Sequence, residues 1–158
     1  MIRILFVCHG NICRSPMAEF VMKDMVKKAG LERSFEIASA ATSSEELGNP
    51  VYPSARRLLA AHGIDCSEKT ARRLNQGDYD RWDYIVGMDE ENMYNMRRLF
   101  SGDPEGKLYH MMAFAGRPNA AVADPWYTRD FERTWRDVNE ACKGFLKKLT
   151  ETEPDIRG

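Results

Sequence analysis

The stretch VCHGNICRSP near the N-terminus concentrates side chains that could do chemistry. It follows an apolar run and contains Cys8 and, six residues later, Arg14. Gly10 adopts positive φ freely and Asn11 tolerates it better than most residues, so the loop can curl with its N–H groups pointing inward. A helix beginning near Ser15 would aim its N-terminus at the same point. The stretch therefore predicts an anion site with a thiol at its base.

This combination of residue types suits phosphoryl transfer. The Arg14 guanidinium can hold two phosphate oxygens in a fork, and positive surroundings favour the thiolate of Cys8 as the nucleophile. Ser15 could donate a hydrogen bond to that sulfur. The late segment ADPWY offers Asp124 as the acid that would protonate the leaving oxygen.

The surrounding pattern alternates apolar runs of strand length with amphipathic helical stretches. Strands are expected at Ile2–Val7, 35–42 and 82–88 and within 107–114, and helices at 15–30, 54–63, 89–100 and 131–149. Such alternation predicts a parallel α/β sheet, in which ligands bind beyond the carboxyl ends of the strands. The Cys8 loop lies at such an end.

Length and composition narrow the class of protein. The 158 residues suit one domain over 1–158, with a frayed tail at 151–158. A net charge of −1 argues against nucleic acid, and no apolar run is long enough to span a membrane. The first residues are too short an apolar run for an export signal, so we expect a cytoplasmic protein with reduced thiols.

The cysteines could instead be structural residues or metal ligands. Alone, Cys8 would most often be a small buried hydrophobic residue. Cys8, His9 and Cys13 could suggest zinc, but no second ligand pair has metal-type spacing, and no metal is expected. Nucleotide-binding glycine motifs are also absent from the sequence. Cys-x5-Arg-Ser between a strand and a helix is more specific than either cysteine.

The sequence resembles the low-molecular-weight protein tyrosine phosphatases over essentially its whole length. The segments that carry the resemblance are VCHGNICRSPMAE, AATSS, GNP, HGID, DYIVGMDEEN and DPWY. The resemblance implies a single-domain α/β fold with a four-stranded parallel twisted sheet and helices on both faces, flavodoxin-like or Rossmann-like. It also implies hydrolysis of phosphotyrosine or aryl phosphate monoesters in protein substrates, without a cofactor.

The resemblance assigns roles to individual residues. Cys8 would form a phosphocysteine, Arg14 would hold the phosphoryl group, and Asp124 would act as acid and then as base. The remaining substrate-binding positions are the rest of the loop, its support and the walls of the ring slot: His9, Gly10, Asn11, Ile12, Cys13, Ser15, Glu45, Trp126 and Tyr127.

Three positions depart from the family pattern. Glu45 stands where an aromatic residue is common, Lys69 replaces a histidine that usually tethers the phosphate loop, and His9 occupies a variable position. We expect Glu45 to shift substrate preference towards basic or neutral flanking residues; the alternative is that Glu45 points to solvent and Trp126 alone walls the ring slot. His62 and His110 form no recognisable catalytic or metal-binding pattern with other residues of the sequence and are interpreted as structural.

Rival functions remain to be distinguished. Arsenate reductases share the loop but need two closely spaced further cysteines, whereas Cys66 and Cys142 are far apart. Protein arginine phosphatases carry Thr where this chain has Ile12, whose apolar side chain suits a phenyl ring better. A phosphocarrier would lack an acid such as Asp124.

The loop also predicts a redox response. Cys13 lies five residues after Cys8, within reach of a protective disulfide if the nucleophile is oxidised. We expect the protein to be a monomer that acts on phosphotyrosine-containing proteins and binds neither nucleic acid nor membranes.

Overall fold

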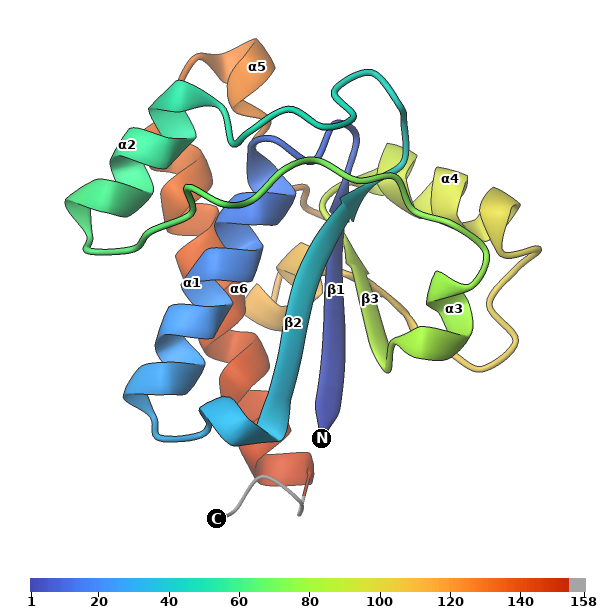
Figure 1. The fold of residues 1–158 in the computed structure, drawn as a ribbon. Helices are drawn as coiled ribbons and strands as arrows, with labels where there is room; N and C mark the ends of the chain where they lie inside the picture. The colour runs from blue at the N-terminus through green and yellow to red at the C-terminus, as the bar shows by residue number, and fades with distance from the viewer. Residues whose placement is uncertain (154–158) are drawn as a thin grey trace.

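The computed structural model describes residues 1–153 and contains four strands and eight helical segments in one α/β domain (Figure 1). The strands are β1 (Ile2–Cys8), β2 (Phe35–Ala41), β3 (Tyr84–Gly87) and β4 (Leu108–His110). The α-helices are α1 (Arg14–Lys28), α2 (Pro53–Ala61), α3 (Asp78–Arg81), α4 (Glu90–Leu99), α5 (Pro125–Thr128) and α6 (Phe131–Thr152). Two 3₁₀ helices complete the set: η1 (Glu32–Ser34) and η2 (Met111–Ala115).

The central strand β1 is buried on both faces, because its apolar side chains alternate between two cores. Ile4 and Phe6 pack in a cluster with α1 and α6, and Phe6 meets Phe145 of α6 edge to face. Leu5 and Val7 point the other way, into a cluster with α3 and α4. A strand covered on both sides needs a nearly continuous apolar run, which IRILFVC provides.

All strand pairs are parallel, in the order β2-β1-β3-β4. Cys8 at the end of β1 pairs with Ala41 at the end of β2, and the preceding Val7 pairs with Gly87 at the end of β3. The segments that follow these three strands therefore emerge at one edge of the sheet, where the Cys8 loop lies.

One glycine sets the distance between α6 and the segment that follows β4. A Cβ on Gly144 would lie 1.9 Å from the carbonyl oxygen of Phe114 in η2, so no other residue fits without movement. The close approach stacks Phe114 on Phe145 with ring centroids 3.9 Å apart. This contact anchors the start of the loop that leads to Asp124.

The predicted fold class is confirmed, and the four expected strands are present within one or two residues of their predicted bounds or inside them. The structure adds α3 and α5, two single-turn helices in segments where the sequence predicted no helix. The last helix runs to Thr152, beyond the expected end at 149, and the Tyr84 hydroxyl donates to Glu153 at 2.8 Å. Residues 154–158 of the predicted frayed tail lie outside the described residues.

None of the helices within residues 1–153 combines the length and the apolar character that a membrane span requires.

Candidate active site

The sulfur of Cys8 lies at the base of a curled loop between β1 and α1. Cys8 is only 4% exposed. Its Sγ lies 3.3 Å from the backbone nitrogen of Asn11 and 3.0 Å from the Oγ of Ser15. Asn11 has the left-handed φ of 60°, which turns its N–H back towards the sulfur. Two donors thus converge on the sulfur, as a thiolate nucleophile requires.

A chain of hydrogen bonds behind the loop sets the direction of these donors. The buried Glu19 carboxylate can only accept hydrogen bonds, so the Ser39 hydroxyl donates to it at 2.5 Å. The Ser39 oxygen then accepts from Nδ2 of Asn11 at 2.9 Å, and the same Nδ2 donates to Ser15 at 2.8 Å. Because Ser15 has one proton and already accepts from Asn11, that proton is left for Cys8.

Lys69 holds the far end of this chain. Its Nζ donates to the backbone carbonyl of Ser39 at 3.0 Å and lies 3.8 Å from the Glu19 carboxylate. Lys23 approaches the same carboxylate at 2.6 Å from the solvent side. Burial lowers the pKa of the Lys69 amine, against the opposing attraction of Glu19. The residue that departs from the family pattern therefore supports the loop through Ser39 and Glu19.

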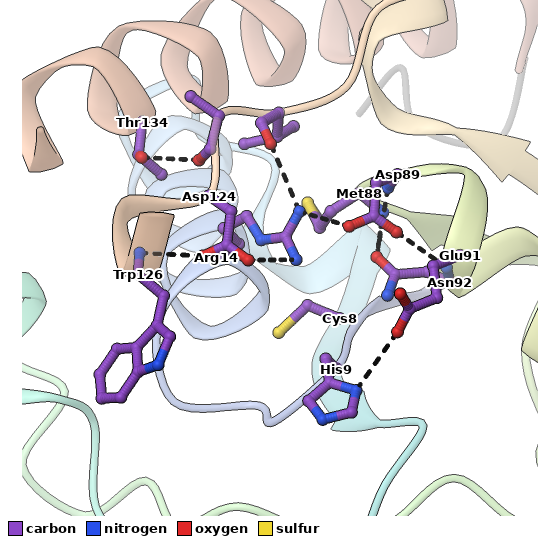
Figure 2. Close-up of polar contacts among 12 residues, drawn as sticks. Cys8, His9, Arg14, Met88, Asp89, Glu91, Asn92, Asp124, Trp126 and Thr134 are labelled. Carbon is purple, nitrogen blue, oxygen red and sulfur yellow. Dashed lines mark hydrogen bonds and ion pairs between the residues drawn. The ribbon is translucent and has the colours of Figure 1, made fainter. Parts of the chain in front are cut away.

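Arg14 lies buried beside the sulfur between two carboxylates (Figure 2). One Nη donates to Asp89 at 2.8 Å and to the Val122 carbonyl at 3.3 Å, and the other lies 3.4 Å from Asp124. Burial opposes the charge on Arg14, but the negative charges of Cys8, Asp89 and Asp124 outweigh burial and raise its pKa. The guanidinium is thus a fixed cation, held in place for a bound anion.

The loop also presents backbone donors. Within residues 1–153, the N–H groups of Gly10, Ile12, Cys13 and Arg14 form no hydrogen bond with a protein acceptor. They surround Cys8 at the N-terminus of α1, where the helix dipole favours negative charge. Unpaired backbone donors next to a guanidinium make a site for a tetrahedral oxyanion such as a phosphoryl group.

Asp124 is positioned by the short helix that it caps. Its Oδ1 accepts from the backbone nitrogen of Trp126 at 3.0 Å, which leaves Oδ2 facing Arg14. The preceding residue is fixed on both sides: the Ala123 carbonyl accepts from Thr134 at 2.7 Å and its N–H donates to Asp137 at 3.0 Å. Both partners belong to α6, so the last helix holds the candidate acid in the pocket next to Arg14.

Aromatic side chains form one wall of the pocket. Trp126 is 57% exposed and Tyr127 84% exposed, although both are large rings. Tyr52 meets Trp126 edge to face at 5.3 Å and stacks on Phe131 at 5.8 Å. The indole is therefore contacted by Tyr52 and still more than half exposed, which leaves it accessible to a planar ligand.

Acidic side chains form the opposite wall. The ring of His9 lies between two glutamates, with Nε2 at 2.9 Å from Glu45 and Nδ1 at 3.7 Å from Glu91. These contacts join the loop after β2 to the first turn of α4. Figure 2 shows Cys8 between Trp126 on one side and His9 on the other.

Cys13 lies next to Cys8 at the start of α1. It is 8% exposed, and burial together with the negative charge of Cys8 raises the pKa of its thiol to about 12. Cys13 is therefore protonated at neutral pH and does not compete with Cys8 as the nucleophile.

Most of the sequence-predicted site residues line a single pocket of about 400 Å³. They are Cys8, His9, Gly10, Ile12, Cys13, Arg14, Glu45, Asp124, Trp126 and Tyr127. The other two, Asn11 in the loop and Ser15 in the first turn of α1, are buried and contact the sulfur directly.

Sequence reasoning missed several residues of the site. Asp89, Glu91 and Glu46 also line the pocket, and Glu19 and Ser39 support the loop from behind. A signal existed for Asp89, because it directly follows the third predicted strand at the carboxyl edge of the sheet and caps α4. Nothing in the sequence marked Ser39, which lies in the middle of a strand.

The two histidines interpreted as structural lie outside this pocket. His62 stacks on Trp135 with ring centroids 4.3 Å apart, and the Nε2 of His110 in β4 lies 3.5 Å from Glu90. Over residues 1–153, no three histidine, cysteine or acidic side chains are grouped as a metal site would need.

Comparison with known proteins agrees with this geometry. Residues 3–154 match the family described as low molecular weight phosphotyrosine protein phosphatase. The chain is 34% identical to the low molecular weight protein-tyrosine-phosphatase YfkJ of Bacillus subtilis, over 94% of this chain and 96% of that protein. It is 37% identical to low molecular weight phosphotyrosine protein phosphatase 1 of Drosophila melanogaster, over 92% and 96%. The crystal structure of YfkJ superposes with a TM-score of 0.92, covering 97% of both chains at 33% identity.

Proposed function

Because this chain belongs to the low molecular weight phosphotyrosine protein phosphatase family, we propose that it hydrolyses phosphotyrosine in proteins through a phosphocysteine intermediate. The observation that carries the proposal is the position of Cys8. Its sulfur receives two donors and lies beside a buried arginine and a ring of unpaired backbone N–H groups. A carboxylic acid side chain lines the same pocket, within 3.4 Å of that arginine.

In the first step, the Cys8 thiolate attacks phosphorus as the bond from phosphorus to the phenol oxygen breaks. Arg14 and the loop N–H groups bind the three equatorial oxygens, whose charge they match in the transition state. Asp124, in its protonated form, gives its proton to the departing phenolate. The products are tyrosine and phosphocysteine.

In the second step, water attacks phosphorus and the bond to sulfur breaks. Asp124, now a carboxylate, accepts a proton from the water. The leaving thiolate is stabilised by the Ser15 hydroxyl and the Asn11 N–H, the two donors that already lie against the sulfur. Inorganic phosphate then leaves.

The pocket supports an aryl substrate over a phosphorylated arginine. Ile12 lines the pocket with an apolar side chain, and Trp126 presents a supported aromatic face. A phenyl ring gains contact with both groups, whereas a phosphoguanidinium would need polar partners there.

The test is turnover of an aryl phosphate and of matched phosphotyrosine, phosphoserine and phosphoarginine peptides. We expect hydrolysis of the aryl phosphate and the phosphotyrosine peptide, and its loss in Cys8→Ser because a hydroxyl is not ionised at neutral pH. Arg14→Lys should be nearly as damaging because the planar fork is lost. Mass spectrometry of quenched Asp124→Ala should detect a phosphate adduct on Cys8. Wild-type turnover in Cys8→Ser, or preferred hydrolysis of phosphoarginine, would refute the proposal.

We further propose that Cys13 protects Cys8 from over-oxidation. Peroxide would convert the Cys8 thiolate to a sulfenic acid, and the Cys13 thiol would then form a disulfide with it and release water. Activity of the wild type should return after mild peroxide followed by a thiol, whereas Cys13→Ser should recover poorly. Equal recovery of the two proteins would show that Cys13 protects nothing.

The protein is also proposed to act as a monomer in the cytoplasm. A reducing compartment keeps the nucleophilic thiol available, and few large apolar side chains in residues 1–153 are exposed. Outside the pocket they are Met1, Leu47 and Tyr94. Sedimentation equilibrium and cell fractionation test these two points, and a stable dimer or a membrane-bound fraction would contradict them.

A further inference from the structure

The mouth of the pocket joins two walls of different chemistry. One wall is aromatic, with Trp126 and Tyr127, and the other is acidic, with Glu45 and Glu91 on either side of His9. The Cys8 sulfur and the Arg14 guanidinium at the base of the pocket determine where the phosphoryl group binds, and the two walls play no part in this. The walls therefore face the ring of the substrate and the residues that flank it.

His9 holds the acidic wall together. It bridges Glu45 in the loop after β2 and Glu91 in the first turn of α4, two segments that are far apart in the sequence. The histidine side chain is 44% exposed and the two glutamates are 69% and 68% exposed. Both carboxylates are thus fixed at the rim and still accessible to a ligand.

The charges of the pocket do not balance. Its lining has five carboxylates and a single guanidinium, that of Arg14, which already pairs with Asp89 and Asp124. Among the described residues, no lysine or arginine forms an ion pair with Glu45 or Glu91. A third rim carboxylate, Glu46, accepts a hydrogen bond from Asn49 rather than a cation. The rim is therefore a negative surface around a site that accepts an anion.

We propose that Glu45 and Glu91 are specificity-determining residues that select phosphotyrosine flanked by lysine or arginine. This inference rests on the proposed phosphatase activity. A basic side chain beside the phosphotyrosine can pair with a rim glutamate while the phosphoryl group binds Arg14. An acidic flank meets repulsion from the same carboxylates, and within residues 1–153 no lysine or arginine pairs with them to offset it.

The size of the effect follows from the exposure of the pairs. An ion pair between exposed side chains changes affinity about two- to fivefold, and like charges cost a similar factor. With two glutamates, we expect kcat/KM to differ about tenfold or more between basic and acidic flanks at low salt. The difference must shrink as salt screens the rim, since the Debye length falls from about 30 Å at 0.01 M to about 3 Å at 1 M.

The experiment compares kcat/KM for three phosphotyrosine peptides of equal length, with lysine, alanine or glutamate flanks, at low and high salt. The proteins are the wild type, Glu45→Gln, Glu91→Gln, the double variant and the matched control Glu105→Gln. Glu105 is exposed and precedes β4, at the opposite edge of the sheet from the pocket. An aryl phosphate without flanking residues is the fourth substrate.

We expect the wild type and Glu105→Gln to prefer basic over neutral over acidic flanks at low salt. Each single variant should reduce the difference in kcat/KM between basic and acidic flanks, and the double variant should nearly abolish that difference. Equal rates on all three peptides in the wild type, or the same ranking in the double variant, would overturn the inference. If the wild type hydrolyses the aryl phosphate, such a result refutes the specificity inference alone. If it does not, the proposed function itself fails and this inference with it.

Discussion

Asn11→Asp is the sharpest test of the hydrogen-bond chain beneath the loop, because it keeps the shape of the side chain and removes its two donors. Nδ2 donates to Ser15 at 2.8 Å and to Ser39 at 2.9 Å, and both bonds are lost. The new carboxylate accepts instead, so the Ser15 proton turns towards it and away from the Cys8 sulfur. The bond from the Arg72 N–H to the side-chain oxygen, 3.2 Å in the wild type, can persist.

The magnitude follows from which bonds change. The Ser15 hydroxyl no longer stabilises the thiolate, and a hydrogen bond to a charged group contributes about 1.5–3 kcal/mol. At about 1.4 kcal/mol for each factor of ten, kcat/KM should fall about 10- to 150-fold. Stability should fall as well, by about 2–4 kcal/mol, because a buried carboxylate is placed close to Glu19 and both compete for the Ser39 proton.

The assay pairs this variant with Ser39→Ala, which removes the next link of the chain. In Ser39→Ala the Asn11 amide still donates to Ser15, so Ser15 still donates to Cys8. We therefore expect kcat/KM on an aryl phosphate to stay within about threefold of the wild type, about 0.6 kcal/mol. Urea unfolding should still detect lost stability, because the buried Glu19 loses a donor. A wild-type rate in Asn11→Asp, or an equal loss in both variants, would refute the order of donors from Asn11 through Ser15 to Cys8.

Three further changes test other parts of the site. Asp124→Asn should slow substrates with basic leaving groups about 10²–10⁴-fold and activated phenols far less, so an equal loss across a leaving-group series would place the acid elsewhere. Burial raises the pKa of the Cys13 thiol from 9.0 to about 12, so the folded state retains a proton that the unfolded chain loses. Stability from this group is complete below pH 9 and falls as pH rises towards 12, by at most about 1.4 kcal/mol per pH unit. Urea unfolding between pH 8 and 11 should show a shallower decline in Cys13→Ala, and an unchanged slope would contradict the burial argument. Lys69→Met should lower the free energy of unfolding by about 1–3 kcal/mol, because the Ser39 carbonyl loses its donor and Glu19 loses an ion-pair partner, whereas a wild-type value would mean that Lys23 alone satisfies Glu19.

The fold class could be predicted because the sequence patterns that indicate strands and helices are local. The alternation of strand and helix lengths identified the parallel sheet, and the confirmed class follows from that order. The single-turn helices α3 and α5 could not be predicted, since four residues carry no periodicity. They depend instead on hydrogen bonds of individual side chains, as when Asp78 accepts from Arg72 and from the indole of Trp82.

By itself, the sequence determined that a thiol, an arginine and a flexible loop share one strand-to-helix turn, because those residues are neighbours in the chain. It could not determine which distant charges meet there. The pairing of Arg14 with Asp89 and the contact of His9 with Glu91 depend on β3 lying next to β1 in the sheet, and the contact of His9 with Glu45 depends on β2 lying on the other side of β1. Strand order brings the ends of separate segments to one edge, and the donors and charges of the site interact over only a few ångströms. The tertiary structure therefore decided the electrostatics of the pocket, while local sequence decided the candidate nucleophile.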